Sequence, residues 1–250
     1  MTVSSLQELR DALNRVSAPP ASSIIDPRSL SFDQHEILDW IRNLHCGGVF
    51  DVDATFGNGS FYQSKILWPT RRFDLDDKLN NCVCASSEAL PLTDQSVNSV
   101  VFDPPFLTYI RAGRGGNGNM AMAKRFSGYW RYDELEEHYK KSIQEFYRVL
   151  RTGGVVVFKC QDIIHNHKIH CTHANIIKWA EAVGFRLKDI FILAAKHRMP
   201  RPNRKGPPQH ARVYHSYFLV LQKTKEKPRG GSGNALDRSS HQGAHQCLIA

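Results

Sequence analysis

The sequence predicts an α/β protein with a mainly parallel sheet and helices on both faces. Segments such as 97–102 and 155–158 are almost continuously apolar, as in strands that are covered on both sides. Stretches with helical spacing of apolar residues lie between such segments, so strands and helices alternate. With 41% hydrophobic and 10% aromatic residues, the 250-residue chain can form a core, which excludes collagen, coiled coil and disorder of the whole chain.

The elements are expected in a definite order. Ser31 or Asp33 caps a first helix, which the Gly47-Gly48 pair ends. Seven strands follow, at about 49–53, 71–75, 82–85, 97–103, 154–160, 187–194 and 213–222. Further helices are expected near 60–68, 133–150 and 172–183. The last two strands are expected to form an antiparallel hairpin, so the sheet has an antiparallel last strand.

The chain divides into an N-terminal extension (1–32), a main domain (33–223) and a tail (224–250) whose Lys, Pro, Gly, Ser and His content predicts disorder. The net charge of +9 suggests a polyanionic partner. We find no apolar run long enough to span a bilayer and no secretory N-terminus, so we expect no membrane contact and an intracellular location. The six cysteines fit reduced thiols better than a disulfide framework.

The segment 49–61 has the pattern strand, glycine turn, helix. Gly57 and Gly59 let the backbone turn sharply and approach a ligand closely. Asp74 ends the next strand, 17 residues after Gly57, where a carboxylate can accept both hydroxyls of a ribose. Tyr62 stands where a third glycine would complete a dinucleotide-binding pattern. We therefore favour S-adenosylmethionine, which has a ribose but no phosphate, over a dinucleotide or an ordinary turn.

The next strand ends in Asp103-Pro104-Pro105-Phe106. Two prolines stop strand pairing and fix the backbone at the carboxyl edge of the sheet, where open parallel sheets bind ligands. Asp103 and the Pro104 carbonyl can accept hydrogen bonds from an aromatic amine and aim its nitrogen at a methyl donor. Phe106 can stack on the base that carries the amine. The alternative is a simple turn.

With these motifs in this order, the chain resembles the class I S-adenosylmethionine-dependent methyltransferases that methylate exocyclic amines of nucleic-acid bases through an Asp/Asn-Pro-Pro-aromatic motif. The resemblance covers roughly 33–223 and extends to the segments 148–159 and 209–220. It implies a Rossmann-like seven-stranded fold and makes 33–223 the catalytic domain. It also implies a cofactor site formed by Asp53, Thr55, Gly57, Asn58, Gly59, Asp74 and Ser86. The usual acidic adenine contact would fall near Ser86, so either Ser86 or backbone amides would contact the adenine.

The segment 107–132 combines basic, glycine and aromatic residues, and a second basic group lies at 196–212. Such segments can follow a phosphate backbone and stack on bases, although a solvated loop is the alternative. We expect nucleic-acid contacts from Arg111, Arg114, Arg125, Tyr129, Arg131, Arg198 and Arg212. The 27 residues after 223 leave no room for a separate recognition domain, so we expect a short recognition sequence or none, unless another subunit supplies it.

The leading hypothesis is methylation of DNA, at adenine N6 rather than cytosine N4, by a protein of bacterial or phage type. RNA methylation, a non-catalytic nucleic-acid binder and a small-molecule methyltransferase are the alternatives. Carbon-5 cytosine methylation is excluded because Cys160 lies in a strand and lacks the usual proline before it. The His-rich stretch 165–173 lacks the ligand spacing of a zinc site, so no metal is expected.

Overall fold

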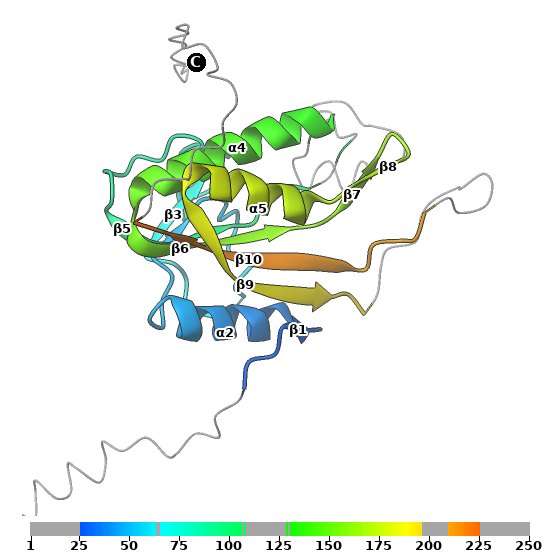
Figure 1. The fold of residues 1–250 in the computed structure, drawn as a ribbon. Coiled ribbons are helices and arrows are strands. Elements are labelled where there is room, and N and C mark those ends of the chain that lie inside the picture. The colour runs from blue at the N-terminus through cyan, green and yellow to red at the C-terminus, as the bar shows by residue number, and fades with distance from the viewer. Residues whose placement is uncertain are drawn as a thin grey trace, which may run out of the picture.

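The computed structural model describes residues 26–63, 66–106, 108, 129, 131–196 and 210–225. Eight strands of this part form one sheet in the order β1-β9-β10-β6-β5-β2-β3-β4, and a separate hairpin pairs β7 with β8 (Figure 1). The strands are β1 (Leu30–Ser31), β2 (Val52–Asp53), β3 (Arg71–Asp74), β4 (Val83–Cys84), β5 (Val97–Phe102), β6 (Leu150–Cys160), β7 (Ile163–His165), β8 (Lys168–His170), β9 (Phe185–Ala194) and β10 (His215–Lys223). The helices are α2 (Gln34–His45), α4 (Tyr132–Val149) and α5 (Thr172–Val183).

Two cores cover the two faces of this sheet. Helices α4 and α5 lie on one face and α2 on the other (Figure 1). The first core packs α4 residues such as Phe146 against Phe102 and Phe158, while the second packs Ile41 of α2 against Val157 and Phe218. Side chains of both cores come from the near-continuously apolar strands β5 and β6, which confirms the predicted α/β layering.

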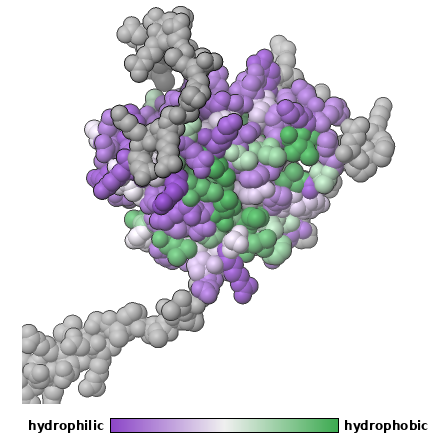
Figure 2. All heavy atoms as spheres, in the orientation of Figure 1, coloured by the Kyte–Doolittle hydropathy of each residue, from purple (hydrophilic) through white to green (hydrophobic). Residues whose placement is uncertain are grey.

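The pairing is parallel except at β10, which runs antiparallel to both β6 and β9. This confirms the predicted closing hairpin and places the last strand inside the sheet. The parallel strands therefore end at one common edge, toward which the β9 arrow points in Figure 1. Figure 2 shows hydrophobic side chains gathered where β9 and β10 reach the surface, between hydrophilic regions. Among the described residues, no helix is both long and apolar enough to cross a membrane.

Local sequence features explain the positions of the helices α2, α4 and α5. Asp33 caps α2 by accepting a hydrogen bond from the His35 amide at 2.8 Å, so the second of the two proposed caps is the one used. Helix α5 ends at Gly184, whose φ of 117° is the left-handed conformation that favours glycine. Helix α4 buries an apolar stripe and starts one residue before its predicted position.

Four expectations about elements are wrong. The described residues of 60–68 form turns rather than a helix, because Gln63 adopts a positive φ and Phe61 and Tyr62 pack as aromatic anchors. The sheet gains an eighth strand, β1, which lies within the predicted extension and pairs with β9. The stretch 163–170, which lies outside the predicted strands, forms a hairpin. Strand β6 begins at Leu150 rather than near 154, so Gly154 lies inside it and faces the Asn98 carbonyl so closely that a Cβ would lie 2.8 Å from that oxygen.

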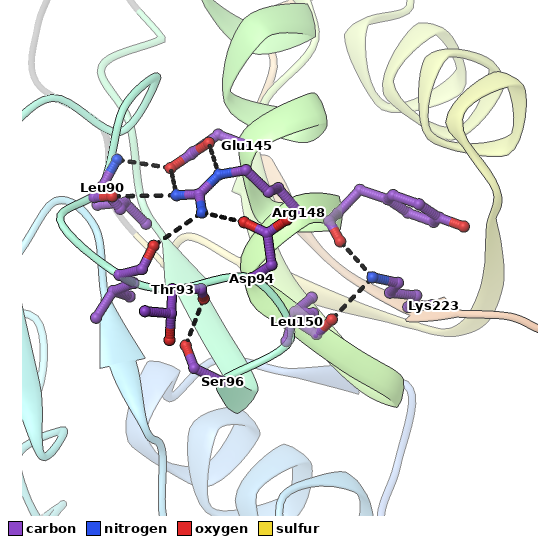
Figure 3. Close-up of polar contacts among 10 residues, drawn as sticks. Leu90, Thr93, Asp94, Ser96, Glu145, Arg148, Leu150 and Lys223 are labelled. Carbon is purple, nitrogen blue, oxygen red and sulfur yellow. Dashed lines mark hydrogen bonds and ion pairs between the residues drawn. The ribbon is translucent and has the colours of Figure 1, made fainter.

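A polar cluster at the far end of α4 fixes that helix to the loop before β5 (Figure 3). Arg148 donates to both carboxylate oxygens of Glu145, to Asp94 and to the carbonyls of Leu90 and Leu92, at 2.6–3.1 Å. These five bonds use the full donor set of a guanidinium. The Glu145 side chain is only 9% exposed, so Arg148 neutralises a carboxylate that water solvates poorly.

Candidate active site at the carboxyl edge of the sheet

The glycine loop and the Asp-Pro-Pro-Phe corner meet at the carboxyl ends of neighbouring strands. Strands β2 and β5 are parallel and pair directly, so the residues that follow them are neighbours. The hydroxyl of Thr55 accepts a hydrogen bond from the Asp103 amide at 2.9 Å. Gly57 and Asp103 therefore lie at one edge of the molecule, as the sequence predicts.

Asp53 organises the loop from inside. Its side chain is buried, with Oδ1 accepting from the Thr55 amide at 2.7 Å and Oδ2 accepting from the Tyr62 hydroxyl at 2.5 Å. Burial raises the pKa of Asp53 to about 7, against the opposing effect of these hydrogen bonds. Asp53 thus holds the loop in shape, and its predicted contact with a cofactor stays a prediction.

Asp74, the predicted ribose-binding residue, lies beside the glycine loop. The Gly57 amide donates to Asp74 Oδ2 at 2.8 Å, and the Asp76 amide donates to Oδ1 at 3.0 Å. A carboxylate has about four acceptor sites, so Asp74 keeps acceptor capacity for a ligand. Gly57 has a φ of 56°, and a Cβ added there would meet nothing within 4 Å. The loop is therefore open where a ligand would approach, and these residues fit the sugar of S-adenosylmethionine.

Three other predicted cofactor residues shape turns. Gly59 has a φ of 77°, and a Cβ there would lie 2.9 Å from Phe56 and Trp68, so packing requires this glycine. Asn58 accepts from the Ser60 amide at 3.0 Å, which closes a local turn. Ser86, just after β4, accepts from the Glu88 amide at 3.2 Å. Whether Asn58, Gly59 and Ser86 contact a cofactor remains a prediction.

Asp103 lies against Lys159, to which the sequence motifs assign no role. Lys159, near the end of β6, places Nζ 3.3 Å from Oδ1 and donates to Oδ2 of Asp103 at 3.4 Å. Oδ1 is buried and has no hydrogen-bond partner. Burial raises the pKa of Asp103, and the charge and hydrogen bond of Lys159 oppose that rise. The site thus presents a partly exposed carboxylate with unused acceptor capacity.

The rest of the corner is fixed by the first core. Tyr139 of α4 donates to the Pro105 carbonyl at 3.0 Å, and the Tyr139 side chain is fully buried. Pro104 is buried, and the half-buried Phe106 packs against the same core. A rigid corner of this kind can position a substrate group without reorganising.

Of the residues predicted to contact nucleic acid, Arg111, Arg114, Arg125 and Arg198 lie outside the described residues. Tyr129 is half-buried, packs edge-on against His138 and Tyr139, and has a pKa raised by burial. Arg131 pairs with Asp133 beside the start of α4, and the Arg212 guanidinium lies 5.6 Å from the Tyr214 ring centroid. Contacts of these residues with nucleic acid remain predictions.

The described residues contain no cluster of three His, Cys, Asp or Glu side chains that could hold a metal ion. The five described cysteines are free, and Cys160 is fully buried. In the His-rich stretch, His170 stacks on Tyr132 at 3.7 Å between ring centroids, and His173 pairs with Asp162 at 2.7 Å. These contacts give the stretch packing and pairing partners.

Sequence reasoning missed the roles of Lys159, Tyr62 and Tyr139, because each acts through contacts with residues elsewhere in the sequence. The Tyr139 hydroxyl reaches the Pro105 carbonyl across 34 positions, and Lys159 reaches Asp103 across 56. One signal was present, since a lysine at the second-to-last position of a buried strand needs a partner. That signal identifies Lys159 but gives no hint of which carboxylate it meets.

A mainly parallel sheet, a glycine loop with a carboxylate beside it and an Asp-Pro-Pro-Phe corner at one edge are the features by which this chain resembles the class I S-adenosylmethionine-dependent methyltransferases. A family model described as "DNA methylase" (N6_N4_Mtase) matches residues 97–244, which is more than half of the chain. The chain belongs to this family. A search of curated proteins found no match.

Solved structures with similar folds are distant. TTHA0409 of Thermus thermophilus, a provisionally assigned DNA modification methylase solved in complex with S-adenosyl-L-methionine, shares 18% identity over 57% of this chain and 51% of its own, at a TM-score of 0.37. Thermus thermophilus TrmN shares 17% identity over 75% of this chain and 48% of its own, at a TM-score of 0.46. A Burkholderia thailandensis 1,6-didemethyltoxoflavin-N1-methyltransferase shares 12% identity over 89% of this chain and 85% of its own, at a TM-score of 0.45. This chain spans about half the length of TTHA0409 and TrmN.

Proposed function

We propose that this protein transfers a methyl group from S-adenosylmethionine to the exocyclic amine of a DNA base, with adenine N6 as the target. The observation that carries the proposal is Asp103 Oδ1, a buried acceptor without a hydrogen-bond partner beside the glycine loop. A buried polar atom without a partner is costly, and a substrate amine would supply the missing donor. The family match to DNA methylases supports the choice of DNA.

The residues of the corner act on the amine. Asp103 accepts one amine hydrogen, which makes the nitrogen more tetrahedral and directs its lone pair toward the donor. S-adenosylmethionine supplies a methyl on a positively charged sulfur, which leaves as a neutral thioether. As the nitrogen–carbon bond forms, the carbon–sulfur bond breaks, and the nitrogen then releases one proton to Asp103 and on to water. The half-buried Phe106 offers a stacking surface, which favours the larger purine.

A base in duplex DNA must leave the helical stack to reach Asp103, at a cost of a few kcal/mol. Phosphate contacts from the basic segments at 107–132 and 196–212 would offset that cost. The proposal therefore includes the seven predicted contact residues as its nucleic-acid surface.

The direct test supplies tritiated S-adenosylmethionine with duplex DNA, single-stranded DNA, RNA and free nucleosides, followed by digestion and chromatography of the labelled product. We expect label in N6-methyldeoxyadenosine. Label in N4-methyldeoxycytidine would correct the base, label in RNA alone would correct the substrate, and label in free nucleosides alone would replace the nucleic-acid proposal. No transfer to any of them would reject the activity.

A matched variant tests the role of Asp103. Asp103→Ala should lower methyl transfer at least about a hundredfold, in line with the loss of one well-placed group at a reacting centre. The same variant should bind S-adenosylmethionine in calorimetry as the wild type does, because Gly57 and Asp74 are untouched. Undiminished turnover of Asp103→Ala would reject the assigned role.

A further inference from the structure

Lys159 lies in a nearly closed environment at the centre of the site. Its side chain is 12% exposed, and Nζ donates to Gln34 Oε1 at 2.8 Å as well as to Asp103. The ammonium also lies 4.9 Å from the Phe61 ring centroid and 5.7 Å from that of Phe218. A charge with so little water around it needs a counterion, and Asp103 is the carboxylate in contact with it.

The same lysine links the two halves of the site. Gln34, the first residue of α2, donates to the Phe61 carbonyl at 2.9 Å and accepts from Lys159. Phe61 precedes Tyr62, which leads through Asp53 and Thr55 back to the Asp103 amide. Hydrogen bonds and chain neighbours thus form a ring around the edge of the sheet, and Lys159 closes it.

The geometry of the pair suits an assisting role. Nζ is almost equidistant from the two carboxylate oxygens, at 3.3 and 3.4 Å, which is longer than the ~2.8 Å of a tight charged hydrogen bond. The contact therefore supplies positive charge and uses little of the acceptor capacity of Asp103. An amine donor can bind the carboxylate without displacing the lysine.

We propose that Lys159 is the positioning residue of this active site, which holds Asp103 in its anionic form and in place between the cofactor loop and α2. This inference rests on the proposed function and gives a role to a residue to which the sequence motifs assign none. Lys159 acts through Asp103 and needs no contact with the base or the methyl donor.

Other titratable groups also face Asp103. The Asp53 carboxylate on β2, the Tyr62 hydroxyl in the cofactor loop and the Tyr139 hydroxyl on α4 all interact with its charge. Of these groups, Asp53 has a pKa in the assay range, and its titration is present in variants at position 159 as well as in the wild type. A difference in the pH profile between the wild type and such a variant therefore reports on the Lys159–Asp103 pair.

The test measures kcat against pH for the wild type, Lys159→Met, Lys159→Arg and Lys140→Met. Removing the ammonium should raise the pKa of Asp103, so the acidic limb of the Lys159→Met profile should move upward by about 1–3 pH units. The rate should fall roughly tenfold for each unit by which that pKa exceeds the assay pH. Lys159→Arg should keep the wild-type limb. Lys140→Met, which removes an exposed lysine on α4 paired with Glu136, should change nothing.

Two further readouts separate this inference from its alternatives. The KM for S-adenosylmethionine should stay constant in Lys159→Met, whereas a distorted fold would raise it. When Lys159→Met is added to Asp103→Asn, kcat should fall little further, because no carboxylate remains to be held ionised. This double variant also leaves no unpaired buried charge. The inference would be overturned if the wild type is active but the acidic limb of the Lys159→Met profile does not shift. It would also be overturned if Lys159→Met lowers kcat equally in the wild-type and Asp103→Asn backgrounds. An inactive wild type would instead reject the proposed function.

Discussion

The two ends of the sheet treat buried charge in opposite ways. At the Arg148 cluster every guanidinium donor has an acceptor, and Glu145 is paired through both oxygens (Figure 3). At the carboxyl edge, Asp103 has Lys159 as a loose ion-pair partner, and its buried Oδ1 accepts no hydrogen bond. A complete network stabilises a fold, whereas an incomplete one has a cost that a ligand can relieve. The difference supports the proposal that the carboxyl edge is the active site.

The largest effect on stability should come from breaking the complete network. Arg148→Met leaves the Glu145 carboxylate and the Leu90 and Leu92 carbonyls without their shared donor. We expect the free energy of unfolding to fall by about 3–5 kcal/mol in urea denaturation. Arg151→Met, which removes an exposed arginine that donates to Asn98 at 3.3 Å, is the control and should cost under about 0.5 kcal/mol.

Methyl transfer per folded molecule should be unchanged in Arg148→Met at a temperature where it remains native. A loss of turnover equal to that of Asp103→Ala would show that the two ends are coupled and would undo the comparison.

The next effect concerns the buried charge of Asp53. Its raised pKa means that the native state holds this proton more tightly than the unfolded chain does, so its stabilisation is full below about pH 4 and is lost as pH rises to about 7. Asp53→Asn removes this titration. As the pH rises from 4 to 8, the free energy of unfolding of the variant should therefore increase by about 2–4 kcal/mol relative to that of the wild type.

Urea unfolding of both proteins at several pH values measures this gain. If the free energies of unfolding of the two proteins change in parallel with pH, Asp53 has an ordinary pKa in the folded protein, and its burial in the glycine loop does not destabilise its charged form.

The smallest effects should separate the two glycines of the loop. Gly59→Ala places a Cβ against Phe56 and Trp68 in a strained backbone region, so we expect a loss of about 2 kcal/mol in thermal unfolding. Gly57→Ala meets only open space and should cost about 1 kcal/mol. Although Gly57→Ala costs little stability, it should weaken the affinity for S-adenosylmethionine measured by calorimetry, because the added methyl group enters the space where the ligand would approach. Unaltered affinity would place the ligand away from Gly57.

The parts of the fold that sequence could predict are those that long periodic segments determine. Helices α4 and α5 and strands β5 and β6 have patterns of buried residues that local reasoning recognises. The strand β1 has only two residues, and no pattern can identify an element of that length. The segment 60–68 fails for another reason, since aromatic packing around Tyr62 and Trp68 overrides its helical spacing.

The candidate site divides in the same way. Asp74, Gly57 and Asp103 could be predicted because motif order and strand ends bring them to one edge. The roles of Asp53 and Lys159 depend on burial and on partners from other strands, which spacing does not encode. Local motifs thus identify residues that come together at one edge of the sheet, and tertiary packing decides which other residues hold them there.

The place of β10 has a consequence for how the protein is made. This strand fills the gap between β6 and β9 and is the last of the described strands to leave the ribosome. Until residues 215–223 emerge, β6 and β9 each expose an edge with unpaired amides and carbonyls. The nascent sheet is therefore open at its middle from the emergence of β9 until that of β10, which is the stage at which chaperones would have most to protect.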